Sequence, residues 1–196
     1  EFVSGIYADP AEPQILYAID YGSGLAVRST NRGEDWQVIS PESLIFSLNV
    51  SHVPGIGTVL YAGSHDGQVW RSLDQGSSWT QVKTDVEFAA ITDIRLSRQI
   101  DRVYIASAAE GFFRLQFGLD SIAIIPLAEL SSANLIVEDA ITPGIVYLVP
   151  FNEAAYMVDD RGSRPTLTPI IDQPFIAENG TVSSVIAHAA ESGSGL

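Results

Sequence analysis

The chain has 196 residues, with 10 basic and 24 acidic side chains, which gives a formal net charge of −14 at neutral pH. Hydrophobic residues make up 46% of it and charged residues 17%, so it can bury a core and is not a disordered chain. The acidic balance disfavours nucleic acid and anionic membrane as partners, because both need clustered basic residues. The absence of cysteine excludes disulfides, thiolate metal sites and cysteine nucleophiles. No stretch approaches the roughly 18 apolar residues that cross a bilayer, so we expect no membrane insertion.

Short apolar segments separated by turn residues follow one another along the chain. The expected innermost strand of each successive unit covers Val3 to Ala8, Phe46 to His52, Ile91 to Leu96 and Leu135 to Ala140. The second unit displays the whole pattern, with four strands expected at Phe46 to His52, Thr58 to Ser64, Gln68 to Leu73 and Trp79 to Lys83. No longer window shows a convincing helical period, so the sequence predicts an all-β fold.

Two markers repeat along the chain at nearly the same interval. Tyrosines recur in equivalent apolar segments with spacings of 44, 43 and 43 residues, at Tyr17, Tyr61, Tyr104 and Tyr147. Arginines recur every 43 residues, at Arg28, Arg71 and Arg114. A unit of about 40–45 residues with four strands is the size of one β-propeller blade.

A short sequence motif also repeats, between one of these tyrosines and the next. Residues 72–79 read Ser-Leu-Asp-Gln-Gly-Ser-Ser-Trp, residues 29–36 have the related Ser-Thr-Asn-Arg-Gly-Glu-Asp-Trp, and a degenerate copy occupies 158–165. In the remaining unit, at 115–122, the motif is eroded. Its carboxylate or amide suits a tight turn, its glycine allows positive φ, and its tryptophan covers the turn. We therefore assign a structural role to Ser29, Asn31, Gly33, Trp36, Ser72, Asp74, Gly76, Trp79, Asp160 and Gly162.

The pattern Ser-x-Asp-x-Gly-x-x-Trp resembles the Asp-box, or BNR, repeat of sialidases, sortilin-type receptors, xyloglucan-cleaving glycosidases and photosystem assembly factors. The resemblance implies a β-propeller whose boxes form hairpins at the periphery, away from the central site. The expected blades cover residues 1–42, 43–86, 87–130 and 131–175. Residues 183–189 align with 3–9, so 176–196 is expected to begin a fifth blade of a partial propeller. The open edges would then be covered by further sequence or by other chains.

No catalytic constellation is evident in the sequence. Three arginines bind the substrate carboxylate in sialidases, but evenly repeated arginines cannot converge on one pocket, so a structural role is favoured for them. The three histidines lack metal-ligand spacing, and no phosphate-binding loop or nucleophile elbow occurs. We therefore expect no metal, no cofactor and, on balance, no enzymatic activity.

Propellers bind ligands on the face that carries the loops from second to third strands and from one blade to the next. The residues that we expect on this face are Asp20, Tyr21, His65, Asp66, Glu110 and Glu153. Such an acidic rim favours a cationic partner surface or, more weakly, calcium. The competing interpretation is that surface loops of an acidic protein are acidic in any case. Apolar residues at 44–46, 86–88 and 174–175 would add protein contacts or begin the next inner strands.

The sequence favours a non-enzymatic binding or assembly module, in an extracellular or periplasmic protein or complex. Another protein or other chains of an assembly are the favoured partners, and a glycan is possible. The first alternative is one part of a glycoside hydrolase or sialidase-like propeller. A further alternative is a photosystem-type assembly factor, which the shortage of basic residues for docking disfavours.

Overall fold

The computed structural model describes residues 3–20, 22–117, 122–128, 133–151, 154–162 and 164–170. These residues form four antiparallel sheets of four strands, here called blades 1 to 4. Blade 1 contains β1 (Val3–Ala8), β2 (Leu16–Asp20), β3 (Leu25–Ser29) and β4 (Gln37–Val38). Blade 2 contains β5 (Ile45–Val53), β6 (Gly57–Ser64), β7 (Val69–Ser72) and β8 (Thr80–Val82). Blade 3 contains β9 (Ile91–Leu96), β10 (Arg102–Ser107), β11 (Gly111–Phe117) and β12 (Ile122–Ala128). Blade 4 contains β13 (Ala133–Glu138), β14 (Ile145–Pro150), β15 (Tyr156–Asp159) and β16 (Thr166–Pro169).

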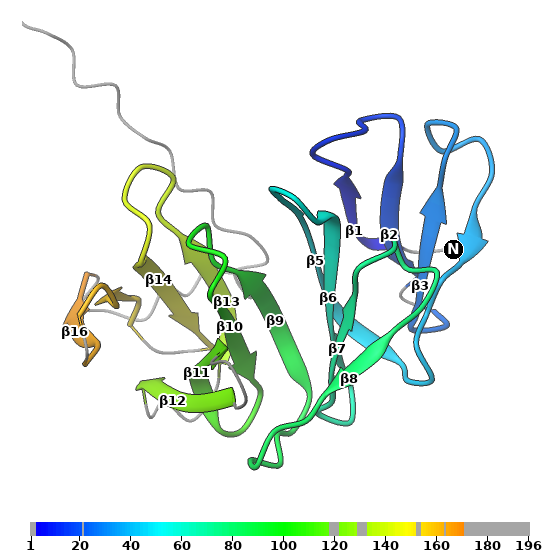
Figure 1. Ribbon diagram of the computed structural model, residues 1–196. Helices are drawn as coiled ribbons and strands as arrows, with labels where there is room; N and C mark the ends of the chain where they lie inside the picture. The colour runs from blue at the N-terminus through cyan, green and yellow to red at the C-terminus, as the bar shows by residue number, and fades with distance from the viewer. Residues whose placement is uncertain are drawn as a thin grey trace, which may run out of the picture.

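Each blade is a simple meander in which consecutive strands pair with one another. The first strand of each blade contacts the neighbouring blades, so β1, β5, β9 and β13 are the inner strands. The blades follow one another in an arc, with blade 1 and blade 4 at its two ends (Figure 1). The expected all-β fold of four-stranded antiparallel sheets is confirmed, and the sheets that the structure describes form an open arc.

The expected strand positions hold closely, with one informative exception. β1 and β9 have the expected bounds, whereas β13 covers Ala133–Glu138 and not the predicted 135–140. The strand stops early because the Asp139 carboxylate accepts hydrogen bonds from the amides of Ile141 and Thr142, at 2.9 and 2.7 Å, and so forms a turn. The Asp9 carboxylate ends β1 in the same way, through the amides of Ala11 and Glu12.

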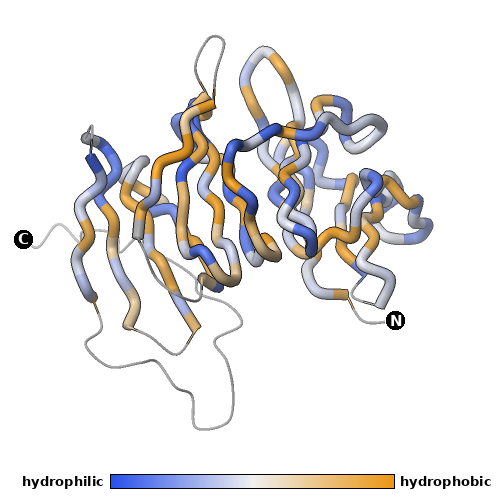
Figure 2. Tube along the Cα trace, turned by 90° about the horizontal axis from the view of Figure 1, so that it is seen from below, coloured by the Kyte–Doolittle hydropathy of each residue, from blue (hydrophilic) through white to orange (hydrophobic). Residues whose placement is uncertain are grey.

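The hydrophobic core is divided among the three boundaries between blades. Between blades 1 and 2 it includes Tyr17, Ile39, Leu48 and Leu60. Between blades 2 and 3 it includes Tyr61, Ile94, Val103 and Ile105. Between blades 3 and 4 it includes Tyr104, Phe112, Ile136 and Leu148. The hydrophobic stretches lie largely within the strands (Figure 2). This is expected for a sheet such as blade 2 or blade 3, which has a neighbouring blade on both faces.

The predicted start of a fifth blade, at 176–196, lies outside the described residues. The blade boundaries proposed from the repeat also stay predictions. No helix among the described residues is long and apolar enough to cross a membrane.

Candidate binding cleft on the loop face

A cleft of about 360 Å³ lies between blades 1 and 2, where the loops between their strands meet. Three connecting segments meet there, namely the loop between β2 and β3, the connection from blade 1 to blade 2 and the start of the loop after β6, and β1 and β2 add one residue each. We call this the loop-face cleft, and it is lined by Ser4, Ile19, Gly22, Ser23, Gly24, Leu44, Ile45, Phe46 and His65.

Backbone hydrogen bonds hold the three pieces of chain together. The Ile45 amide donates to the Gly24 carbonyl at 2.7 Å, and the His65 amide donates to the Leu44 carbonyl at 2.9 Å. Gly24 has φ of 66°, and a Cβ there would lie 3.2 Å from the Leu44 Cβ. Glycine therefore allows both the turn and the close approach of the connecting segment.

Carboxylates next to the cleft shape its loops. Asp20 accepts hydrogen bonds from the Ser23 hydroxyl at 2.5 Å and the Gly22 amide at 3.2 Å. The Ser23 hydroxyl is the main cause that lowers the pKa of Asp20 from its ordinary value. Asp66, which follows His65, accepts from the Ser64 hydroxyl and the Gln68 amide group. Hydrogen bonds therefore hold both carboxylates in fixed orientations beside the cleft.

The cleft also contains an exposed aromatic surface. Phe46 is 44% exposed although it lies in strand β5. Its ring centroid lies 6.3 Å from that of His65, with the two planes tilted by 50°. This pair presents an apolar plate next to a group with hydrogen-bonding nitrogens.

The structure brings together only part of the predicted loop-face set. Asp20, His65 and Asp66 lie in or beside the loop-face cleft, whereas Glu110 lies on the corresponding loop of blade 3. Glu110 accepts from the Ala89 amide and the Ser107 hydroxyl. Burial raises the pKa of Glu110, but hydrogen bonds from Ser107, from Ala89 and from its own backbone together outweigh it and lower the pKa. Tyr21 and Glu153 lie outside the described residues.

Asp93, on the inner strand β9, is the described residue that most resembles a catalytic acid. Burial raises the pKa of its carboxyl, a property that is common at active sites. Its oxygens, however, accept from the amides of Ile94 and Ile136, both at 2.9 Å, and from the Arg95 guanidinium. These contacts join the inner strands of blades 3 and 4, so Asp93 acts in blade packing.

The boxes of blades 1 and 2 form matching hairpins. In blade 2 the Ser72 hydroxyl donates to Asp74 and accepts from the Gly76 amide, both at 2.8 Å. In blade 1 Ser29 makes the same contacts with Asn31 and Gly33. The two turns also share positive φ at equivalent positions, Arg32, Gly33, Gln75 and Gly76.

The tryptophans of the two boxes are not equivalent, contrary to the expectation that each covers its own hairpin. The Trp36 indole N–H donates to the Gly33 carbonyl of its own turn, and the side chain is 41% exposed. The Trp79 indole N–H instead donates to the Ile39 carbonyl of blade 1 and packs into the core between blades 1 and 2. The difference arises because blade 2 has a preceding blade to contact among the described residues.

Two of the three repeated arginines, Arg28 and Arg114, reach the hairpin of the next blade. Arg28 donates to the Gln75 carbonyl in the box of blade 2, at 2.9 Å. Arg114 donates to Asp160, in the fourth copy of the box. Arg71 contacts Tyr61, since the box of blade 3 is eroded. Each arginine is therefore held at a separate place in the fold and not in one pocket.

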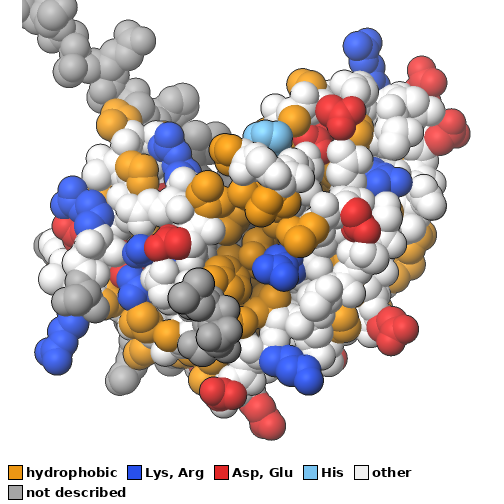
Figure 3. Space-filling model, viewed as in Figure 1, with side chains coloured by type: hydrophobic (Ala, Val, Ile, Leu, Met, Phe, Trp, Pro, Cys, Tyr) orange, Lys and Arg blue, Asp and Glu red, His pale blue; other side chains and the backbone are white. Residues whose placement is uncertain are grey.

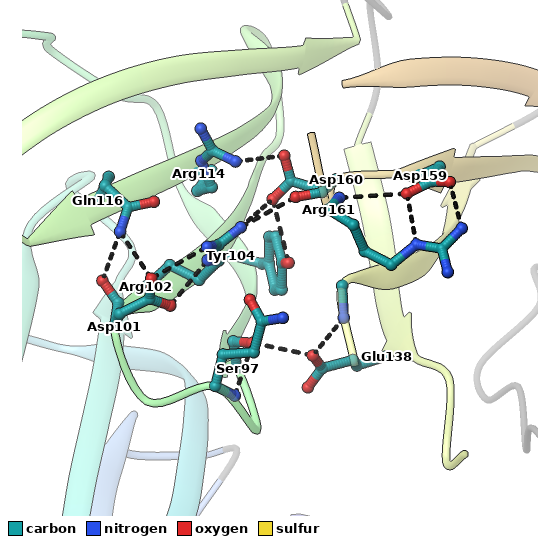
Figure 4. A network of polar contacts seen from close by, with 12 residues as sticks. Ser97, Asp101, Arg102, Tyr104, Arg114, Gln116, Glu138, Asp159, Asp160 and Arg161 are labelled. Atoms are coloured by element: carbon teal, nitrogen blue, oxygen red, sulfur yellow. Dashed lines mark hydrogen bonds and ion pairs between the residues drawn. The ribbon is translucent and has the colours of Figure 1, made fainter. Parts of the chain in front are cut away.

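The fourth copy of the box departs from the others. Val158 replaces the serine, and Asp160, which is fully buried, accepts from Arg102, Arg114 and the Tyr104 hydroxyl of blade 3 (Figure 4). Its carboxylate thus faces the preceding blade. Gly162 follows it in the turn of the same hairpin.

Sequence reasoning missed part of the cleft lining, namely Ser4, Ile19 and the contact of Phe46 with His65. The hydrophobic run at 44–46 was a usable signal, because apolar side chains beside a polar loop mark a surface for contact. Among the described residues no group of three histidine, aspartate or glutamate side chains could hold a metal ion.

No family model and no curated protein sequence matches the chain. Solved structures similar to it include two GH74 enzymes. An ancestral GH74 enzyme superposes with a TM-score of 0.67 and 21% identity, over 83% of this chain and 23% of its own. A GH74 enzyme of Niastella koreensis superposes with a TM-score of 0.68 and 14% identity, over 86% of this chain and 30% of its own. The chain thus spans less than a third of either, and the likeness shows a propeller-like fold.

Proposed function

We propose that the chain is a glycan-binding propeller module of the Asp-box type, from an exported protein, and that the loop-face cleft receives the sugar. The observation that carries this proposal is Phe46, a large aromatic side chain left 44% exposed in a cleft beside ordered polar groups. An exposed aromatic ring offers a flat apolar surface that suits the C–H face of a pyranose.

Polar groups around Phe46 suit the hydroxyl groups of a sugar. The cleft is lined by His65 and Ser23, which bring an imidazole and a hydroxyl group. The Asp20 carboxylate lies beside it and accepts from the Ser23 hydroxyl. Ligand sites commonly combine an apolar wall with a few oriented polar groups, and 360 Å³ lies within their usual size range. Binding without hydrolysis is favoured because the residues that line the cleft include no carboxylate.

A second candidate is one part of a glycoside hydrolase propeller. The similarity to two GH74 glycoside hydrolases favours it, and sugar binding near the loop face would serve such an enzyme equally well. In this case the two catalytic carboxyl groups would come from other parts of a longer protein, because hydrolysis needs an acid and a second carboxylate across the sugar.

Titration of immobilised oligosaccharides, including xyloglucan fragments, tests the proposal. We expect binding by the wild-type chain and at least a tenfold loss of affinity in Phe46→Ala, with an unchanged melting temperature. Leu73→Ala is the matched control, since Leu73 is 49% exposed on the hairpin of blade 2 and outside the cleft. Equal affinities for the two variants would contradict the cleft as the binding site.

A reducing-sugar assay on the same oligosaccharides separates the two candidates. The binding module predicts no release of reducing ends by the chain. Hydrolysis that persists in purified protein and is lost with substitution of one of its own carboxylates would favour the enzyme and contradict the binding module.

A further inference from the structure

No described residue of another blade covers one face of blade 1, although the same face is covered in every other described blade. Cross-strand partners in an antiparallel sheet point to the same side. In blade 1, partnering gives the row Ile6, Ala18, Val27 and Val38. The equivalent rows of blades 2, 3 and 4 begin with Leu48, Ile94 and Ile136.

The exposure of these equivalent residues differs sharply. Leu48, Ile94 and Ile136 are 1%, 0% and 0% exposed, because each packs against the preceding blade. Ile6 is 62% exposed and Val38 at the far end of its row is 57% exposed, whereas the small Ala18 between them is 1% exposed. The open face of blade 1, with Ile6, Val38 and Trp36, is here called the head face. Its sequence is that of a covered face, and apolar surface of this kind marks a contact site.

The described chain also carries the complementary surface, on blade 4. In each internal boundary the preceding blade supplies a buried tyrosine, Tyr17, Tyr61 or Tyr104. Tyr147 of blade 4 occupies the same place in its strand and is only half-buried. The face of blade 4 with Tyr147, Met157 and Ile170 is here called the tail face.

The contact at the box can be matched in detail. Ile39 and Ile170 are equivalent, since each follows the last strand of its blade. The Ile39 amide donates to Ala26 in the third strand, and the Ile170 amide donates to Ala155, directly before the third strand. Ile39 is 6% exposed, contacts the box of blade 2 and accepts from Trp79. Ile170 is 47% exposed and Trp36 is 41% exposed. Among the described residues, both halves of one internal contact are therefore present and exposed.

We infer that the head face of one chain docks on the tail face of a second copy, so that the chains assemble head to tail. The Ile170 side chain of one copy then contacts the box of the other. There Trp36 exchanges its bond to the Gly33 carbonyl for one to the Ile170 carbonyl, as Trp79 donates to Ile39. Such an interface joins two different surfaces, and it forms a ring if the rotation closes or a filament if it does not. This inference is independent of the proposed sugar binding.

Sedimentation of four proteins tests the inference. The wild-type chain is expected to show concentration-dependent mass of two or more chains. Ile6→Asp places a charge on the head face and is expected to sediment as one chain. Ile56→Asp is the matched control: Ile56 is 57% exposed on the hairpin between β5 and β6, outside both faces, and association should persist. Ile170→Asp should also abolish self-association.

Mixing Ile6→Asp with Ile170→Asp, the two variants that should not self-associate, distinguishes head-to-tail docking from a symmetric contact. Ile6→Asp keeps an intact tail face and Ile170→Asp keeps an intact head face, so their mixture is expected to form a complex of one chain of each. Failure of the mixture to associate would overturn the inference. So would a wild-type chain that stays monomeric up to its solubility limit, or self-association that survives Ile6→Asp.

Discussion

The boundary between blades 1 and 2 and the boundary between blades 3 and 4 are bridged by the same repeated arginine, but with different acceptors. Arg28 donates to a neutral carbonyl, that of Gln75. Arg114, two repeats later, forms a buried ion pair with Asp160. The repeat has therefore kept the place of the donor while the acceptor changed from a turn carbonyl to a buried carboxylate. A buried charge needs its partner far more than a carbonyl does.

The boundary between blades 2 and 3 shows a third solution. Phe117 stands 43 residues after Asp74, where a box would have its carboxylate. Its ring lies 6.2 Å from that of Tyr61, and Phe88 and Phe113 form an edge-on pair at 5.1 Å. Hydrophobic side chains gather along the middle of the molecule on this side (Figure 3). Loss of the box is thus accompanied by aromatic packing.

The largest effect is expected from Asp160→Ala. The change leaves Arg114 buried without its acceptor and removes a partner of Arg102 and Tyr104. Breaking a buried ion pair lowers the free energy of unfolding by about 3–5 kcal/mol. Urea unfolding measures this free energy. The neighbouring Asp159→Ala is the control, since Arg161 lowers the pKa of this exposed carboxyl to about 2 but water screens the pair. Similar losses in the two variants would contradict the special role of Asp160.

Gly76→Val should have the next largest effect. The added Cβ would lie 2.5 Å from the Ile39 Cδ1, and φ is 86°. We expect a loss of about 1–3 kcal/mol in the free energy of unfolding. Gly55→Val separates the two causes, because Gly55 has φ of 80° but open space around its Cβ position. If both variants unfold at the same urea concentration, contact between the box and blade 1 has no part in the effect.

The tryptophans give a smaller and more specific contrast. Trp79→Phe removes the hydrogen bond to Ile39, so we expect a loss of about 1 kcal/mol in the free energy of unfolding. Trp36→Phe removes a bond in an exposed turn, where water replaces the acceptor, and its effect should stay within about 0.5 kcal/mol. A larger loss for Trp36 in thermal unfolding of the monomer would contradict the difference between the two hairpins.

The smallest effect is a pH dependence at Asp74. The Ser78 hydroxyl, followed by the Ser78 amide, lowers the pKa of Asp74 below its ordinary value of 3.8. Its contribution to stability is therefore present above pH 3.8 and is lost as the pH falls through the lower folded pKa. Asp74→Asn, which copies Asn31 of blade 1, should remove this slope from acid unfolding curves. An unchanged slope would show that the carboxylate contributes nothing.

The four described blades could be predicted because the tyrosine and arginine positions recur with the period of one blade. The strands of blade 2 could be placed because Gly-rich turns bound them. The partners of Asp160 could not, since two 43-residue shifts align it with Asp74 while its carboxylate faces Arg102 and Arg114 of another blade. Position in a repeat fixes the backbone, but neighbours in space fix what a side chain contacts.

The candidate site divides in the same way, into positions that the repeat predicts and contacts that depend on neighbours in space. The loop face could be predicted from where strands end, and Asp20, His65 and Asp66 do lie around one cleft. Contact between Phe46 and His65 could not, because it depends on how blade 1 packs on blade 2. The sequence also treated the loop acids as free to bind a partner, whereas Asp66 and Glu110 each accept hydrogen bonds within the fold.

The most direct test of the central claim, that the loop face binds ligand while the boxes hold the blades together, is NMR mapping of a bound oligosaccharide. Amide shifts are recorded while a xyloglucan fragment is added to saturation. The account predicts that the largest changes fall at residues 22–24, 44–46 and 65. Changes confined to the hairpins at 31–35 and 74–78, or no changes at saturation, would contradict it.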